Sequence, residues 1–150
     1  MKSLPFLVLL LLSAATPRAQ SDCDCRKVGN DVVTTWGVKP YAIELPDTYP
    51  SLEGKVADSA GDAVDGALLE VFDHPEAGSW FRGSAPSGKA RQKRVAACRT
   101  GEEGCFRFSL SAGEYELRVS RPGFDAVVLR VKVKPGGKAP DKPLEIYLLR

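Results

Sequence analysis

The residues of this chain that could do chemistry are one histidine, four cysteines and a cluster of aromatic and basic residues in one segment. Because His74 is the only histidine, catalytic and metal-binding schemes that need two imidazoles are excluded. The serines near it lack the Gly-x-Ser-x-Gly context of a nucleophile elbow, and no glycine-rich phosphate loop opens a helix. We therefore expect a protein that is not an enzyme, with no catalytic residue, metal or cofactor.

Two of the cysteines, Cys98 and Cys105, flank a turn-rich stretch between two strand-like runs. If Val95 and Ala97 face inward on the first run, and Phe106 faces inward on the second, both cysteines face outward. Facing residues of a hairpin have Cβ atoms about 4.5–5.5 Å apart, which is within reach of a disulfide. The sequence therefore predicts a Cys98–Cys105 hairpin disulfide.

The other two cysteines, Cys23 and Cys25, are separated by one residue, and a bond between them would be strained. They pair either with Cys98 and Cys105 or with a partner chain, and sequence alone does not choose among the connectivities. A zinc site is disfavoured because the Cys-x-Cys and Cys-x6-Cys spacings match no common zinc module.

A long connection, residues 74–92, separates a strand-like run that ends near Asp73 from one that begins near Lys93. Connections longer than about 12–15 residues tend to be functional or disordered. Aromatic rings stack on sugars or partner side chains, and guanidinium groups bind carboxylates or phosphates. The alternative is that the rings cover an edge of the fold and the basic side chains are solvated. Our candidate binding residues are Trp80, Phe81, Arg82, Lys89, Arg91, Lys93 and Arg94.

The N-terminus has the pattern of a secretory signal peptide. One lysine precedes a short leucine-rich block, too short for the roughly 20 residues of a membrane-spanning helix, and small residues follow. We expect cleavage after Ala19, or else after Ala15, and a secreted, periplasmic or extracellular protein with no stable membrane span. Loss of residues 1–19 leaves 19 basic and 19 acidic side chains, so nucleic-acid binding is not expected.

Apolar and polar residues alternate along most of the chain after residue 51, as in half-buried antiparallel strands. Residues 20–50 contain three prolines and predict an irregular segment that allows short strands near 31–36 and 41–45. Turn residues divide the remainder, which predicts an all-β, seven-stranded antiparallel sandwich. The expected strands are 52–57, 66–73, 93–99, 105–110, 114–120, 125–134 and 143–149.

Several of these runs resemble carboxypeptidase regulatory-like domains: LEGKVAD at 52–58, GALLEV at 66–71 and AGEYELRV at 112–119. The resemblance covers about residues 51–149 and implies a transthyretin-like (prealbumin-like) Greek-key sandwich. Related sandwiches include ring-cleaving dioxygenases that bind iron through two histidines and two tyrosines, for which this chain has one histidine too few. Because no peptidase domain is present in the chain, the resemblance implies a fold and no activity.

Three functions remain open. The first is a secreted, non-catalytic binding or scaffolding module that recognises a protein or a cell-envelope component through the 74–92 loop. The second is a small carbohydrate-binding protein, which would need ring stacking from Trp80 or Trp36. The third is an unrecognised enzyme, in which His74→Ala would abolish the activity.

Overall fold

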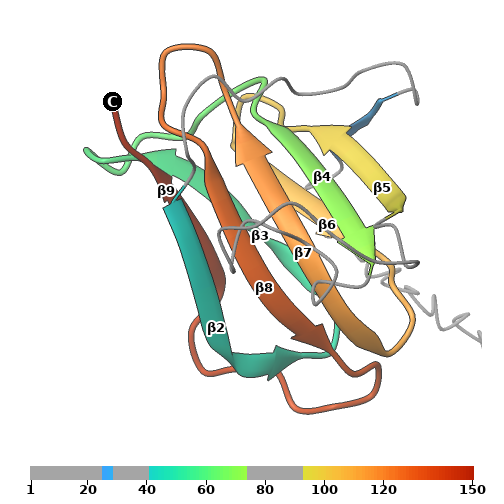
Figure 1. Ribbon diagram of the computed structural model, residues 1–150. Helices are drawn as coiled ribbons and strands as arrows, with labels where there is room; N and C mark the ends of the chain where they lie inside the picture. The colour runs from blue at the N-terminus through green and yellow to red at the C-terminus, as the bar shows by residue number, and fades with distance from the viewer. Residues whose placement is uncertain (1–24, 29–40, 74–92) are drawn as a thin grey trace, which may run out of the picture.

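The computed structural model describes residues 25–28, 41–73 and 93–150, which form nine strands and no helix (Figure 1). The described part of the chain therefore contains no helix that is long and apolar enough to cross a membrane. The strands are β1 (Arg26–Lys27), β2 (Tyr41–Tyr49), β3 (Leu52–Asp58), β4 (Leu68–Asp73), β5 (Arg94–Arg99), β6 (Cys105–Phe108), β7 (Gly113–Ser120), β8 (Val127–Val133) and β9 (Leu144–Leu148).

The strands form two sheets that face each other across one apolar core. The large sheet has six strands in the order β1-β5-β4-β7-β8-β2, and the small sheet has three in the order β6-β3-β9. One side chain in two along each central strand points into the core, as the alternation predicted. The fully buried core side chains include Leu52, Val56, Leu69, Val71, Phe106, Leu117, Val119, Val131, Ile146 and Leu148.

All seven predicted strands are present, and their ends lie within three residues of those expected. The all-β sandwich is thus confirmed, but the strand number and the purely antiparallel pairing are not. Strand β2 pairs in parallel with β8, and β3 pairs in parallel with β9. Parallel partners are far apart in sequence, so alternation within each strand carries no information about them.

Both additional strands come from the N-terminal segment and form the two edges of the large sheet. Strand β1 pairs with the end of β5, and β2 runs along β8 for nine residues, with an irregularity between Glu44 and Thr48. The possible strand near 41–45 is therefore confirmed and extends to Tyr49, so the segment 20–50 is not irregular over 41–49. The predicted signal segment 1–19 and the possible strand at 31–36 lie outside the described residues.

The predicted Cys98–Cys105 disulfide is wrong, because Cys98 is bonded to Cys25 with a Cα–Cα distance of 5.5 Å. Strands β5 and β6 belong to different sheets and do not form a hairpin. In addition, Val95 is an extra residue at an irregularity in the β4–β5 ladder and is 44% exposed, so Cys98 faces the core. The Cys25–Cys98 bond was one of the alternatives left open, and Cys23 lies outside the described residues.

The turn between β5 and β6 carries the chain from one sheet to the other. Gly104 has a φ of +69°, and a Cβ atom there would collide with the carbonyl oxygen of Val56. Its own carbonyl oxygen accepts a hydrogen bond from the Val56 N–H at 2.8 Å. Glycine is therefore required at this position, both for the backbone conformation and for the close approach to β3.

Candidate binding site at the base of the 74–92 loop

The two ends of the 74–92 loop are joined by two hydrogen bonds. The Asp73 N–H donates to the Lys93 carbonyl oxygen at 3.0 Å, and the Lys93 N–H donates to Asp73 Oδ1 at 2.7 Å. Asp73 ends β4 and Lys93 directly precedes β5, which is its antiparallel neighbour. The loop therefore leaves the large sheet and returns to it at one fixed point.

Of the seven predicted binding residues, the structure describes only the two at this base. Lys93 is exposed and Arg94 is half-buried. The other five, together with the lone histidine, lie outside the described residues: Trp80, Phe81, Arg82, Lys89, Arg91 and His74.

Arg94 forms an ion pair across the large sheet. Its Nη1 lies 3.0 Å from Glu70 Oε2, and the two side chains are 13% and 4% exposed. Removing one member of a buried pair leaves an uncompensated charge and costs about 3–5 kcal/mol. The Arg94 guanidinium group therefore stabilises the scaffold of the loop. The sequence predicted Arg94 as a ligand-binding residue.

A second buried pair lies on the neighbouring strand. Arg118 Nε is 2.7 Å from Glu116 Oε1, whose side chain is fully buried. The Arg118 guanidinium also lies 3.8 Å above the ring of Phe72, which faces Glu116 across the β4–β7 ladder. The residues of both pairs, together with Phe72, lie on the side of the large sheet that faces away from the small sheet: Glu70, Phe72, Arg94, Glu116 and Arg118.

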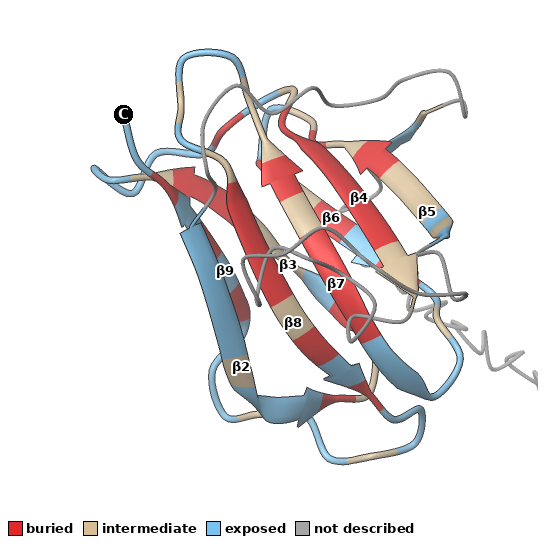
Figure 2. Ribbon diagram, viewed as in Figure 1, coloured by how far each residue is buried: buried red, intermediate tan, exposed pale blue. Residues whose placement is uncertain are grey.

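Figure 2 shows buried residues in unbroken runs along β4 and the middle of β7. Alternation in half-buried strands places carboxylates on a solvated face, whereas Glu70 and Glu116 are buried. The signal that could have found them is the placement of opposite charges at facing positions, as with Glu70 and Arg118 on β4 and β7. Such facing positions are known only once the strands have been paired.

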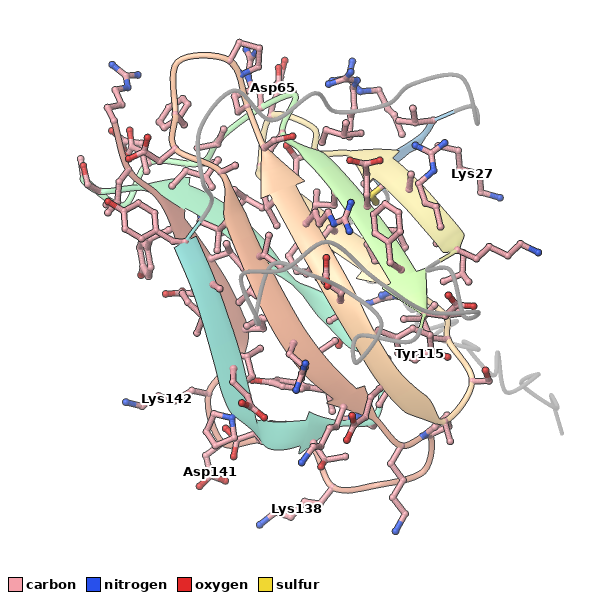
Figure 3. All side chains as sticks on the ribbon, in the orientation of Figure 1. Lys27, Asp65, Tyr115, Lys138, Asp141 and Lys142 are labelled. Carbon is pink, nitrogen blue, oxygen red and sulfur yellow. A yellow bond between two sulfur atoms is a disulfide. The ribbon has the colours of Figure 1, made fainter. Side chains whose placement is uncertain are left out.

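A hollow of about 720 Å³ lies beside β5, between the edges of the two sheets. Its described lining contains three basic side chains, from Lys27, Arg94 and Arg107, and the aromatic ring of Phe108. Lys27 points outward from β1 next to this hollow (Figure 3). Arg107 is paired with Glu53 at 2.9 Å and Arg94 with Glu70 at 3.0 Å, and Lys27 adds an exposed cation.

A smaller hollow of about 340 Å³ lies against the small sheet and is lined partly by Tyr49, Pro50, Pro140 and Pro143. The pKa of Tyr49 is raised above its ordinary value, first by burial of the phenol and then by the charge of Asp47. The phenol therefore stays protonated at neutral pH and could donate a hydrogen bond to a ligand. Among the described residues, no group of three or more histidine, cysteine, aspartate or glutamate side chains could hold a metal ion.

Comparison with solved structures finds ring-cleaving dioxygenases at low similarity. The 3-chlorocatechol 1,2-dioxygenase of Rhodococcus opacus 1CP is 13% identical with a TM-score of 0.39, covering 84% of this chain and 74% of its own. The hydroxyquinol 1,2-dioxygenase of Pseudomonas putida DLL-E4 is 15% identical with a TM-score of 0.40, covering 88% and 68%. Similarity at this level carries no argument about activity. No curated protein matches the sequence.

The comparison with protein families gives a definite result. The sequence model of the carboxypeptidase regulatory-like domain matches residues 51–144, which is more than half of the chain. The matched region begins just before β3 and ends at the first residue of β9, so β1 and β2 lie outside it. It contains strands β3 to β8, which come from both sheets, and both ends of the 74–92 loop. The chain belongs to the carboxypeptidase regulatory-like domain family.

Proposed function

We propose that this protein is a secreted, non-catalytic binding module that presents the 74–92 loop to a protein or a cell-envelope component. The observation that carries the proposal is the fixed base of the loop, formed by the hydrogen bonds between Asp73 and Lys93. Binding residues are typically found on loops that a rigid scaffold positions, because the scaffold lowers the entropy lost on binding.

The scaffold beneath the loop is rigid for four reasons. Strand β4 lies inside the large sheet with a neighbour on each side, and β5 is joined to Cys25 by a disulfide. The buried Glu70–Arg94 pair fixes the first residue of β5. The far end of β5 is held by Thr100, whose hydroxyl donates to the Val64 carbonyl oxygen at 2.6 Å. Motion at the loop base would disrupt these buried interactions.

The chemistry of the loop favours a partner with anionic groups. Its sequence contains two adjacent aromatic residues and three basic ones, and Lys93 adds positive charge where the loop meets the sheet. Basic side chains recognise carboxylates and phosphates, and aromatic rings add contact area at a low entropic cost. We therefore expect the partner to be an acidic protein surface or an anionic envelope polymer.

The test compares the capture of a partner from envelope extract by the unchanged mature protein and by three variants. In the first variant a short Gly/Ser linker replaces residues 75–92, and in the second Lys89 and Arg91 are changed to glutamate. The matched control carries Lys138→Glu and Lys142→Glu, since these lysines point into solvent far from Lys27 (Figure 3). We expect the loop variants to lose the partner and the control to retain it. Equal capture by all forms would overturn the proposal.

A further inference from the structure

Strand β2 is an edge strand that is exposed to an unusual degree. Tyr41 and Ile43 are 54% and 46% exposed, although they point to the same side of the sheet as the buried Val127 and Leu129. Exposed edge strands with apolar side chains are templates for pairing with another chain. Strand β2 lies on the left-hand side of Figure 1, together with β9, where Tyr147 is 49% exposed.

The backbone N–H and C=O groups on the unpaired side of β2 can be assigned to particular residues. The Tyr41 N–H donates to the Ala126 carbonyl oxygen at 3.0 Å, and Tyr41 faces Val127 in the parallel ladder with β8. Since alternate residues of a strand direct their backbone groups to opposite sides, Ile43 also bonds to β8. The N–H and C=O groups of Ala42 and Glu44 therefore point away from the sheet.

We propose that two copies of this chain associate through β2, antiparallel, with a twofold axis at Ile43. In this register Ala42 of one copy faces Glu44 of the other, and each of these two pairs exchanges two backbone hydrogen bonds. The ladder therefore contains four hydrogen bonds and joins the two large sheets into one. Ile43 faces Ile43 of the second copy as a non-hydrogen-bonded pair, the arrangement in which side chains lie closest.

A twofold axis at Ile43 fits the sequence of β2 better than an axis at either neighbouring residue does. It places Tyr41 opposite Leu45 and ends the ladder just before Pro46, which has no N–H to donate. An axis at Glu44 would bring two like charges face to face, which is destabilising. An axis at Ala42 would pair only residues 41–43 of β2, which makes a shorter ladder.

The occupant is therefore a second copy of this chain, since the twofold axis at Ile43 matches the outward backbone groups and sets the apolar side chains of Tyr41, Ile43 and Leu45 against those of the other copy. A ladder of five residues buries little surface compared with obligate dimers, so the association is weak and reversible. Because β2 forms one edge of the large sheet while β4 and β5 lie toward the other, pairing leaves the base of the 74–92 loop accessible on both copies. Two loops on one particle would strengthen binding to a multivalent partner.

The test uses Ile43→Lys and Ile43→Glu, measured by sedimentation velocity over a range of concentrations. Each variant alone places like charges opposite each other across the twofold axis, and we expect the dissociation constant to rise at least about tenfold. A mixture of the two places Lys opposite Glu, and we expect a heterodimer to form. A mixture that stays monomeric, or a wild-type protein that is monomeric at about 1 mM, would overturn the proposal.

A backbone variant tests the hydrogen bonds separately from the side chains. Ala42→Pro removes an N–H that points away from the sheet, and proline is tolerated in edge strands at such positions. We expect this variant to be monomeric with an unchanged circular dichroism spectrum. The matched control is Val95→Lys, which changes an apolar residue of similar exposure. Val95 lies on β5, toward the other edge of the large sheet, so the dimer should stay intact. Dimerisation of Ala42→Pro, or its loss in Val95→Lys, would contradict the β2 register.

Discussion

The two outward faces of the sandwich carry the same kind of charge pair in opposite environments. On the large sheet, Glu116 and Arg118 lie 2.7 Å apart with side-chain exposures of 0% and 15%. On the small sheet, Glu53 and Arg107 lie 2.9 Å apart with side-chain exposures of 50% and 56%. The distances are nearly equal, so the pairs differ mainly in their access to water.

This difference shows which charges belong to the scaffold and which belong to the surface. Water screens the exposed pair, and such pairs contribute at most about 1 kcal/mol. The buried pair has lost its hydration, so each charge depends on the other and on its remaining hydrogen bonds. We infer that the large sheet tolerates substitution poorly on both faces, whereas the small sheet tolerates it on its outer face.

The largest expected effect comes from removing a buried carboxylate. Glu116→Ala leaves the charge of Arg118 buried beside Phe72, and we expect the free energy of unfolding to fall by about 3–5 kcal/mol. Glu53→Ala is the matched control on the small sheet and should cost less than about 1 kcal/mol. Urea denaturation of the two variants measures both values. Equal losses would remove the distinction between the faces.

The next effect concerns the disulfide, which ties the N-terminal segment to the large sheet. Cys25→Ala with Cys98→Ala removes a link between residues 73 positions apart, and we expect a loss of about 2–4 kcal/mol in the free energy of unfolding. We expect the fold to persist, because Arg26 still donates hydrogen bonds to Asp65 and to the Thr100 carbonyl oxygen. Unchanged stability would show that the large sheet does not depend on this link.

Much of the fold follows from the sequence, because alternation reports which side chains of one strand share a face. It placed Phe106 in the core and Cys105 on the outward side of β6, as the structure confirms. Alternation wrongly placed Cys98 on the outward face, because the extra residue at Val95 reverses the alternation. The local sequence does not indicate such an irregularity. We assumed a hairpin between β5 and β6, so the change of sheet at Gly104 was not predicted.

The site was less predictable than the fold. The long loop was evident from its length, and its base residues Asp73 and Lys93 lie where the strand ends were expected. Arg94 was not predicted to pair with a carboxylate, because an arginine after a basic loop resembles a ligand-binding residue. Its partner Glu70 lies 24 positions away on the facing strand, so the pair is visible only once β4 and β5 are in register.

A smaller effect sharpens the comparison through the coupling energy of each pair. We expect a double-mutant cycle with Glu70→Ala and Arg94→Ala to give a coupling of about 1–3 kcal/mol. The same cycle with Glu53→Ala and Arg107→Ala should give about 0.2–1 kcal/mol, and it should vanish in 1 M salt, where the Debye length is about 3 Å. A salt-sensitive coupling in the buried pair would indicate that water reaches it.

The smallest effect is an alkaline titration on the exposed face. Tyr147 donates a hydrogen bond to Glu145 at 2.5 Å, and this bond, together with the charge of Glu145, raises the pKa of Tyr147 above its ordinary value of 10.0. Because the folded pKa is the higher one, its stabilising effect is complete below about pH 10 and is lost as the pH rises through the folded value.

Glu145→Gln removes the charge, so we expect Tyr147 to titrate at lower pH, and Tyr147→Phe identifies its contribution to the tyrosinate absorbance. Tyr49 serves as the internal reference, since its pKa is raised first by burial and should not respond to Glu145→Gln. A shift of both tyrosines would mean that the variant disturbs the sandwich as a whole. A shift of Tyr147 alone would show that even on the exposed face a single hydrogen-bonded charge acts locally.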